Sequence, residues 1–430
     1  MPSGCRLTGL ENGRPPKNRL DAMKKHLFVL LACLFVVNIG TGITLPVLPF
    51  YTERLALEGG TATREQIAMH VGGLTGVYVL MQFFFAPLWG RWSDRVGRRL
   101  PILIGIAGYA ASKLVFAVAT TLPLLYTARV VGGILAAGIL PAASAFVADV
   151  TKEDERGRGM AWLGAAASLG LVVGPALGGL AARRDFHFSA RYGHLLVDSF
   201  SVPFLIAALL ALLAFLAALW RLPETLRRAV PVPQDVDAAT AVNRREARGA
   251  LKLLLGFSLV GQFGLAIFEA TFALYAKQVM GYETFEIGAV FVVCGLVMAL
   301  FQVGVAGFLT ERVGEIIQTG AGLALTGASL LLLARTHATP LVLIVVGLLA
   351  LGVALFAPNL ASLISKRGGE RTGAALGTQT AANNLGQAAG PLLGGLLFAW
   401  RADAPYLLAG ALLLIAGGVA ARSAFDAKKA

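Results

Sequence analysis

The sequence predicts an all-α membrane protein with twelve transmembrane helices in two pseudo-symmetric six-helix bundles. Three observations predict it: the composition, the number of apolar runs and an internal repeat. The 430 residues are 57% hydrophobic and 14% charged, whereas soluble domains are roughly 45–50% apolar and about 25% charged. This composition excludes an ordinary soluble enzyme. The net charge of +13 does not indicate a nucleic-acid partner, because the basic residues punctuate apolar runs instead of sharing one face.

Apolar runs long enough to cross a bilayer recur along the whole chain. About 20 apolar helical residues are needed, because unpaired backbone groups are not tolerated in lipid. The twelve predicted spans are 27–50, 70–89, 101–120, 123–148, 160–182, 200–220, 252–277, 285–307, 317–335, 339–363, 372–400 and 404–421.

The distribution of Lys and Arg predicts the orientation. With the N-terminus inside, 26 Lys and Arg lie in cytoplasmic segments and 8 in the opposite loops, as the positive-inside rule requires. Both termini are therefore expected to be cytoplasmic. The short loops favour a bacterial inner (plasma) membrane, and we expect a monomer surrounded by membrane lipid.

The domain boundaries follow from the polar segments. We expect a polar N-terminal tail over 1–22, a six-helix bundle over 23–220, a cytoplasmic linker over 221–251, a second bundle over 252–421 and a C-terminal tail over 422–430. The first span is not read as a signal peptide, because no small-residue cleavage site follows it. Translation from Met1 and from Met23 both remain open.

Two segments recur in the second half of the chain. Residues 90–97 (GRWSDRVG) match 307–314 (GFLTERVG) at an offset of 217, and residues 170–179 match 386–395 at an offset of 216. A duplication of six spans gives two halves with the same orientation, related by an axis along the membrane normal. Such a pair encloses a site between its halves.

The segment 90–99, which we expect to be a loop, concentrates charge between glycines. Glycine permits a tight turn, and the acid and arginines can bond helix ends or neighbouring loops. The alternative is that these charges only set the topology. The residues of interest are Gly90, Asp94, Arg95, Gly97, Arg98 and Arg99.

A stripe of small residues marks the fifth span. Glycines four residues apart allow a partner backbone to come close, and a proline among them can kink the helix. Plain helix packing is the alternative to a sliding or rocking interface. The stripe comprises Gly170, Gly174, Pro175, Gly178 and Gly179.

These motifs resemble those of the major facilitator superfamily, and more narrowly its twelve-span drug/proton antiporters, which include tetracycline and multidrug exporters. The signature between the second and third helices, the glycine motif of the fifth, Pro46–Pro49 in the first, Arg129 with Gly132 and Gly133 in the fourth, and Leu222–Thr225 after the sixth all match. The likeness covers roughly residues 24–421.

The resemblance implies roles for these residues. Asp94 would pair with the start of the eleventh helix and Arg98 with Asp149, which together would latch the halves in the outward-facing state. Helices 1, 4, 7 and 10 would line the cavity, and helices 2, 5, 8 and 11 the seam. One departure is that the acid found in the first helix of some multidrug members is absent, since Asn38 is the strongly polar residue there.

Proton coupling is therefore assigned elsewhere. Glu269 is the acid that lies well inside a predicted span, where an ionised carboxylate is costly, so it can load and release a proton near neutrality. The alternative is a neutral or hydrogen-bonded acid near the outer mouth. Arg129 either pairs with Glu269 or is a structural arginine of the outer rim, and Lys113 is expected to snorkel or to bond a neighbour.

Aromatic and amide side chains on several spans suit a flat, amphipathic organic cargo that can be cationic. Each aromatic residue alone more often packs against lipid or another helix, so the prediction rests on their occurrence as a group. The candidate substrate-binding residues are Asn38, Tyr78, Gln82, Gln262, Phe272, Gln302, Phe356, Asn359, Gln379 and Asn383.

We therefore expect a secondary transporter that exports small amphipathic organic compounds in exchange for protons by alternating access. The alternatives are a metabolite, sugar or lipid transporter of the same fold, uptake instead of export, and a non-transporting membrane scaffold. The sequence carries no catalytic or nucleotide-binding signature, so no enzymatic activity, cofactor or metal is expected.

Overall fold

The computed structural model describes residues 17–58, 63–151, 153–182, 189–192, 195–225, 241–304, 313–368 and 372–429. Nearly all of them are helical. The first half contains α1 (Lys17–Glu58), α2 (Arg64–Val96), α3 (Arg99–Val118), α4 (Leu122–Ala136), α5 (Ile139–Val150), α6 (Glu153–Ala181) and α7 (Val202–Arg221). The second half contains α8 (Ala241–Tyr275), the π turn η1 (Ala276–Met280), α9 (Thr284–Gly304), α11 (Glu315–Leu333), α12 (Thr339–Gly368), α13 (Thr372–Trp400) and α14 (Ala404–Lys429).

Each of the twelve predicted spans falls on helix, which confirms the all-α fold class. Among the described residues, eleven spans are long and apolar enough to cross a membrane. The remaining predicted span is α13, which has 29 residues but a more polar sequence, with amides at Gln379, Asn383 and Gln387. α13 packs between α2 and α8, with Gln379 buried and Asn383 and Gln387 half-buried, as is common for polar residues of a membrane helix that face the bundle interior.

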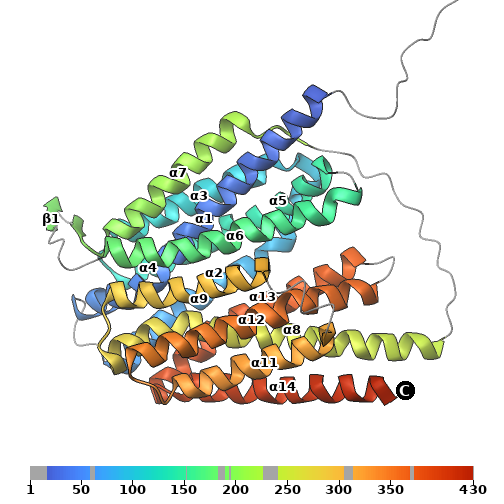
Figure 1. The fold of residues 1–430 in the computed structure, drawn as a ribbon. Coiled ribbons are helices and arrows are strands. Elements are labelled where there is room, and N and C mark those ends of the chain that lie inside the picture. The colour runs from blue at the N-terminus through green and yellow to red at the C-terminus, as the bar shows by residue number, and fades with distance from the viewer. Residues whose placement is uncertain are drawn as a thin grey trace, which may run out of the picture.

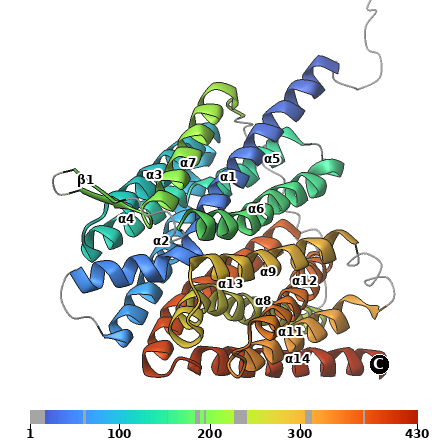
Figure 2. The ribbon, with the colours of Figure 1, turned by 60° about the vertical axis from the view of Figure 1, so that its left-hand side comes forward.

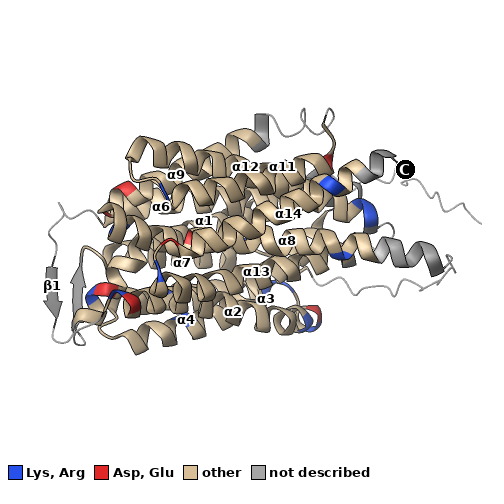
Figure 3. Ribbon diagram, turned by 90° about the horizontal axis from the view of Figure 1, so that it is seen from below, with Lys and Arg blue, Asp and Glu red and all other residues tan. Residues whose placement is uncertain are grey.

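The helices run side by side (Figure 1), with α1–α7 in one part of the bundle and α8–α14 in the other. The start of α1, the turn between α2 and α3 and the end of α14 lie at one end, which we call the inner end. We call the opposite end the outer end. Lys, Arg, Asp and Glu gather mainly at these two ends (Figure 3), and apolar side chains such as Leu209, Leu300 and Ile415 face outward between them. A belt of this kind is suited to lipid and not to water.

The predicted span 123–148 is broken into α4 and α5. Two turn residues, Ala137 and Gly138, separate the helices. Gly138 N–H bonds the carbonyl of Leu135 instead of that of Ile134, and Trp89 Nε1 donates to the freed Ile134 oxygen at 2.7 Å. The carbonyl that the break frees is therefore paired, as buried backbone groups in a membrane must be.

A short hairpin joins α6 and α7. Strands β1 (Ser189–Tyr192) and β2 (Leu195–Asp198) pair antiparallel, with Ser189 opposite Asp198, and project from the outer end (Figure 2). The sequence analysis predicts only a loop here.

The glycine stripes pack each half together. A Cβ at Gly170 or Gly174 in α6 would meet the backbone of α1, and one at Gly386 or Gly390 in α13 would meet the backbone of α8. The two stripes are related by the 216-residue offset, so the repeat detected in the sequence is also a repeat in packing.

The seam between the halves uses the same offset. A Cβ at Gly72 in α2 would lie 2.6 Å from the carbonyl oxygen of Pro391 in α13, and one at Gly288 in α9 would lie 2.7 Å from that of Pro175 in α6. Gly72 and Gly288, like Pro175 and Pro391, are 216 residues apart. The pairs α2–α13 and α6–α9 are thus pseudo-twofold copies of one close backbone contact, and Gly72 and Gly288 both lie near the outer-end starts of their helices.

Candidate functional site

A cavity of ≈ 310 Å³ lies between the halves. Its wall comes from α1, α2, α4, α5 and α6 of the first half and from α8 and α13 of the second. Among the residues that line it, the charged ones are Arg129 on α4 and Glu269 on α8. The cavity therefore presents one cation and one anion on walls that belong to different halves.

Glu269 is partly exposed within the membrane-spanning part of α8. No hydrogen bond or ion pair joins its carboxylate to another described residue. The hydrogen-bonded acid, which was part of the alternative, is therefore not found among the described residues. A carboxyl group of this kind is free to bind a proton or a cation that enters the cavity.

Arg129 is 7% exposed, and its Nε is buried without a hydrogen-bond partner. Its guanidinium carbon lies 4.7 Å from the ring centroid of Phe116 and 5.3 Å from that of Tyr78. Of the two alternatives that the sequence leaves open, the ion pair with Glu269 is not present among the described residues. Arg129 is buried and lines the cavity, and a structural role for it stays a prediction.

A second cavity of ≈ 400 Å³ adjoins the first. Apolar side chains dominate its wall, and they include the aromatic rings of Phe268, Phe291 and Phe356. Glu269 lines both cavities. The site thus has a polar chamber and an aromatic chamber, with the carboxylate at their junction.

The predicted substrate-binding residues divide into three groups. Asn38, Tyr78 and Gln82 line the polar chamber, and Gln262 and Phe356 line the aromatic chamber. The side chain of Gln302 lies outside the described residues.

The third group lines neither chamber. Phe272 is fully buried against Phe268 and Phe291. Asn359 donates to Gln318 Oε1 at 3.1 Å, and Gln379 donates to Ser258 Oγ at 3.3 Å. Asn383 is half-buried and lines neither chamber.

Several lining residues escaped the sequence analysis. Thr41 and Thr44 line the polar chamber, and Phe268 lines the aromatic one in place of Phe272. The signal was present: Thr41 is three residues from Asn38, and a helix face includes i+3 as well as i+4 neighbours. Phe272 lies three residues beyond Glu269 on α8, but its side chain is fully buried in the core and lines neither chamber.

Lys113 does not snorkel to a membrane surface. It is 3% exposed, and its Nζ donates to Thr44 Oγ1 at 2.5 Å. Its ammonium also lies 5.1 Å from the centroid of the Tyr109 ring. The prediction that it bonds a neighbour is confirmed, and it does not line the cavity.

The predicted loop 90–99 is mostly helix, which corrects the sequence analysis. Gly90 lies inside α2, which continues to Val96, and α3 begins at Arg99. The turn itself is Gly97, with φ of +102°, and Arg98. Charges at 91–95 thus lie on the last turns of a helix, where Arg95 is exposed to solvent.

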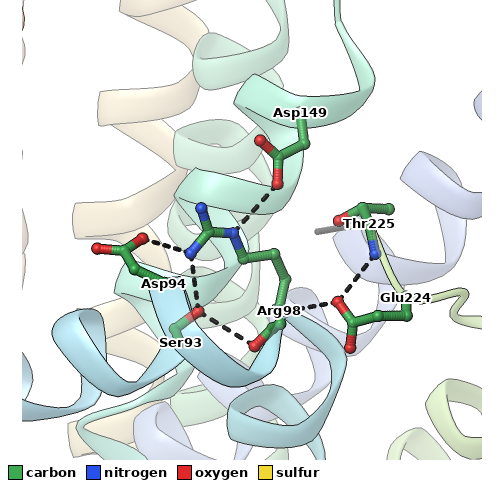
Figure 4. Close-up of polar contacts among 7 residues, drawn as sticks. Ser93, Asp94, Arg98, Asp149, Glu224 and Thr225 are labelled. Atoms are coloured by element: carbon green, nitrogen blue, oxygen red, sulfur yellow. Dashed lines mark hydrogen bonds and ion pairs between the residues drawn. The ribbon is translucent and has the colours of Figure 1, made fainter. Parts of the chain in front are cut away.

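Arg98 is the centre of an ionic cluster at the inner end (Figure 4). Its Nε donates to Asp149 at 3.1 Å and its Nη1 to Asp94 at 2.5 Å. Burial alone would lower the pKa of Arg98, but the hydrogen bonds and charges of the two carboxylates raise it. The predicted Arg98–Asp149 pair is present. It joins α3 to α5 within the first half, so the pair itself does not latch the two halves to one another, in contrast to the expectation. The predicted contact of Asp94 with the start of α13 involves side chains over 371–374 that lie outside the described residues, and it stays a prediction.

Glu224 completes this cluster. Its Oε1 accepts hydrogen bonds from the backbone N–H of Arg98 at 2.7 Å and of Thr225 at 2.9 Å (Figure 4). It also packs against Gly97, where a Cβ would collide with the carboxylate. Nearby, Arg99 donates to the carbonyl of Leu219 at 2.6 Å. The end of α7 is therefore tied to the α2–α3 turn.

The second half carries the same cluster with its charges exchanged. Residues 305–312 lie outside the described residues, but Gly314 has φ of +80° as Gly97 does. Glu315 accepts hydrogen bonds from Lys366 Nζ at 2.8 Å and Ser362 Oγ at 2.5 Å. The offset of 217 relates Gly97 to Gly314, Arg98 to Glu315 and Asp149 to Lys366, so the cation and the anion have swapped places.

We expect the two clusters to differ in strength. Asp149→Asn removes a charged acceptor from the largely buried Arg98, a loss of about 1.5–3 kcal/mol. Lys366→Gln removes a cation that is 68% exposed, which is worth ~0–1 kcal/mol. The melting temperature of the purified protein should fall clearly for the first variant and little for the second. Equal decreases in melting temperature for the two variants would contradict the expectation that the Arg98 cluster is the stronger one.

Comparison with known proteins agrees with this architecture. The sequence profile of the Major Facilitator Superfamily matches residues 30–371 and 304–429. The chain is 30% identical over 401 residues to Multidrug resistance protein 1 of Bacillus subtilis (strain 168), covering 93% of this chain and 96% of that protein. It is 26% identical over 387 residues to Quinolone resistance protein NorA of Staphylococcus aureus, covering 90% of this chain and 93% of that protein.

A solved structure shares the fold. The crystal structure of the human organic anion transporter MFSD10 (TETRAN) aligns with a TM-score of 0.66 at 23% identity and covers 95% of this chain and 100% of that one. The two halves related by one offset, the cavity between them and the matching profile lead to one conclusion. The chain belongs to the Major Facilitator Superfamily.

Proposed function

We propose that the protein exports small amphipathic organic compounds from the cytoplasm in exchange for protons, by alternating access of the two chambers. The observation that carries the proposal is Glu269, an unpaired carboxylate at the junction of a polar and an aromatic chamber between two halves. Membership of the superfamily makes the chain a membrane transporter and not an enzyme.

The cargo class is inferred from the chambers and from the relatives. Pockets for small molecules are mostly apolar with a few polar groups that orient the ligand, and the aromatic chamber with Gln262 and Gln387 at its edge fits that pattern. The names of the relatives, multidrug resistance and quinolone resistance, support a drug-like cargo.

The proton enters the proposal through competition. An ionised carboxylate in a membrane interior is costly, so Glu269 is stabilised either by a proton or by a cargo that supplies polar or cationic groups. Because both cannot occupy it at once, loading a proton favours release of cargo. Export coupled to an inward proton gradient follows from that exclusion.

The geometry of the seam supports alternating access. The described close backbone contacts between the halves lie in the outer half of the bundle, at Gly72, Gly179 and Gly288. Lys277 of η1 also forms an ion pair with Glu53 of α1 at the outer end. Under the predicted topology the outer end faces away from the cytoplasm, so we assign the structure to a state closed on the outside. Residues 23–220 and 252–421 would rock as two units, in a monomer in a bacterial inner membrane with both termini cytoplasmic and no nucleic-acid partner.

The test is transport by purified protein in vesicles. A panel of drugs is first screened for reduced accumulation in an efflux-deficient bacterial host, with and without a protonophore. The strongest hit is then measured in proteoliposomes with an imposed pH gradient. We expect uphill movement of the compound opposite to the proton gradient, and its reversal when the gradient is reversed. Compound movement that does not depend on the pH gradient would refute proton exchange. Compound movement in the same direction as the proton would refute antiport.

A further inference from the structure

We propose that the cargo is a zwitterion: an aromatic compound that places an acidic group on Arg129 and a basic group on Glu269. The inference rests on the proposed function, because it names the chemical class that the same cavity takes. It goes further in assigning a separate recognition site to each charge, one in each half of the protein.

The acidic group follows from the state of Arg129. A guanidinium is always charged in proteins, and an uncompensated buried charge is costly. Arg129 is 93% buried, since its exposed fraction is 7%, and no described residue gives it an ion pair or a hydrogen bond. Two aromatic faces, those of Phe116 and Tyr78, are its described stabilising contacts.

No other charge on the neighbouring elements compensates it. The nearby ionisable group on α3 is Lys113, which is itself cationic and is bound to Thr44. Glu269 shares the cavity but is not within ion-pair distance of Arg129 among the described residues. The planar fork of the guanidinium matches a carboxylate, sulfonate or phosphate in two parallel hydrogen bonds. An acidic group on the cargo would therefore supply the missing counter-ion.

The order of the sites predicts the layout of the cargo. Arg129 lines the polar chamber, Glu269 lies at the junction, and Phe268, Phe291 and Phe356 line the far chamber. A molecule that spans both chambers would present its acid first, its amine next and its ring last. Rings also gain area and aromatic contacts in the far chamber.

The direction of coupling selects the zwitterion over a simple anion. An anion on Arg129 would favour the protonated form of Glu269, since a nearby negative charge disfavours an ionised carboxylate. Cargo and proton would then bind together, which gives co-transport. A basic group on the cargo reverses the sign, because the ammonium and the proton compete for the Glu269 carboxylate. Exchange therefore needs the basic group, and the unpaired Arg129 calls for the acidic one.

The experiment measures equilibrium binding to the purified full chain in detergent, without any gradient. The probes are Nε-dansyl-L-lysine, which has an acid, an amine and a terminal aromatic group, its methyl ester, which lacks the acid, and its Nα-acetyl derivative, which lacks the amine. Dansyl fluorescence reports binding. We expect the zwitterion to bind at least about tenfold more tightly than either derivative, which corresponds to ~1.4 kcal/mol for each charge.

The variants assign the charges to residues. Arg129→Gln should abolish the preference for zwitterion over ester and keep the preference over the acetyl derivative. Glu269→Gln should do the reverse. Arg129→Lys should retain part of the preference over the ester. Lys113→Met removes a buried cation that does not line the cavity and should leave both preferences within about twofold.

Three results would overturn the proposal. The first is an ester that binds to the unaltered protein as tightly as the zwitterion does. The second is an Arg129→Gln variant that binds all three probes equally more weakly, as expected for a purely structural arginine. The third is the absence of measurable zwitterion binding. Failure of the proposed function is separable, because binding needs no gradient. If the protein prefers the zwitterion but shows no proton-driven export, only the proposed proton exchange is refuted. If it shows proton-driven export but no preference for either charge, only the zwitterion proposal is refuted.

Discussion

Glu269→Gln should abolish proton-driven accumulation while leaving the protein folded. Glutamine has nearly the shape of a protonated glutamate but cannot release a proton, so the site is fixed in one state of the cycle. In proteoliposomes the imposed pH gradient should no longer drive uphill movement of cargo. Exchange of labelled for unlabelled cargo should persist, because that exchange needs no change of protonation.

The matched control is Glu65→Gln. Glu65 is an exposed carboxylate in the first turn of α2, so the change removes the same charge outside the cavity. It should leave the gradient dependence unchanged. If Glu269→Gln retained full proton-driven accumulation, the proton would have to be carried by another group.

Gly72→Leu should trap the protein with its outer end unable to close. A Cβ at Gly72 would lie 2.6 Å from the carbonyl oxygen of Pro391 and 2.7 Å from the Cα of Gly395. Backbone atoms cannot move aside as a side-chain rotamer can, so the two helices must separate. We expect transport to fall at least about tenfold, since each ~1.4 kcal/mol of bias toward one state costs that factor.

The conformational shift is measured by labelling. In a background without the three native cysteines, Ala68→Cys places a thiol in the seam, where Ala68 is 1% exposed. A membrane-impermeant maleimide should label it faster when Gly72 is replaced. Gly418→Leu is the control, because a Cβ at Gly418 meets no atom within 4 Å. Unchanged labelling and transport in Gly72→Leu would contradict a rocking seam.

The fold could be read from the sequence because lipid imposes strong conditions on it. A chain that crosses a bilayer must bury its backbone polar groups in helices, so long, mostly apolar runs predicted the spans, and eleven of them are apolar enough to be recognised by that property alone. The break between α4 and α5 was not visible, since it depends on Trp89 from another helix taking over the Ile134 carbonyl. The helical extension of α2 to Val96 was hidden by glycine and charged residues that resemble a loop.

Site residues could be predicted where the residue type alone is unusual for a membrane span. They were harder to predict where their role depends on contacts in the folded protein. Glu269 was found because an acid inside a span is rare. That Arg129 has no partner depends on distances across the cavity, and the sequence left its role open. The pair of Glu315 and Lys366 could not be recognised from the repeat, because identical residues identify a repeat. At these two positions the charges are opposite to those of Arg98 and Asp149.

The central claim is that cargo and proton exclude one another at Glu269. The most direct measurement is proton release on cargo binding, with the purified protein in weakly buffered detergent, a pH-sensitive dye and the strongest export substrate. At a pH at which Glu269 is partly protonated, added cargo should release protons from the unaltered protein and from Glu65→Gln, and none from Glu269→Gln. Saturable binding with no proton release, or with equal release from Glu269→Gln, would contradict it.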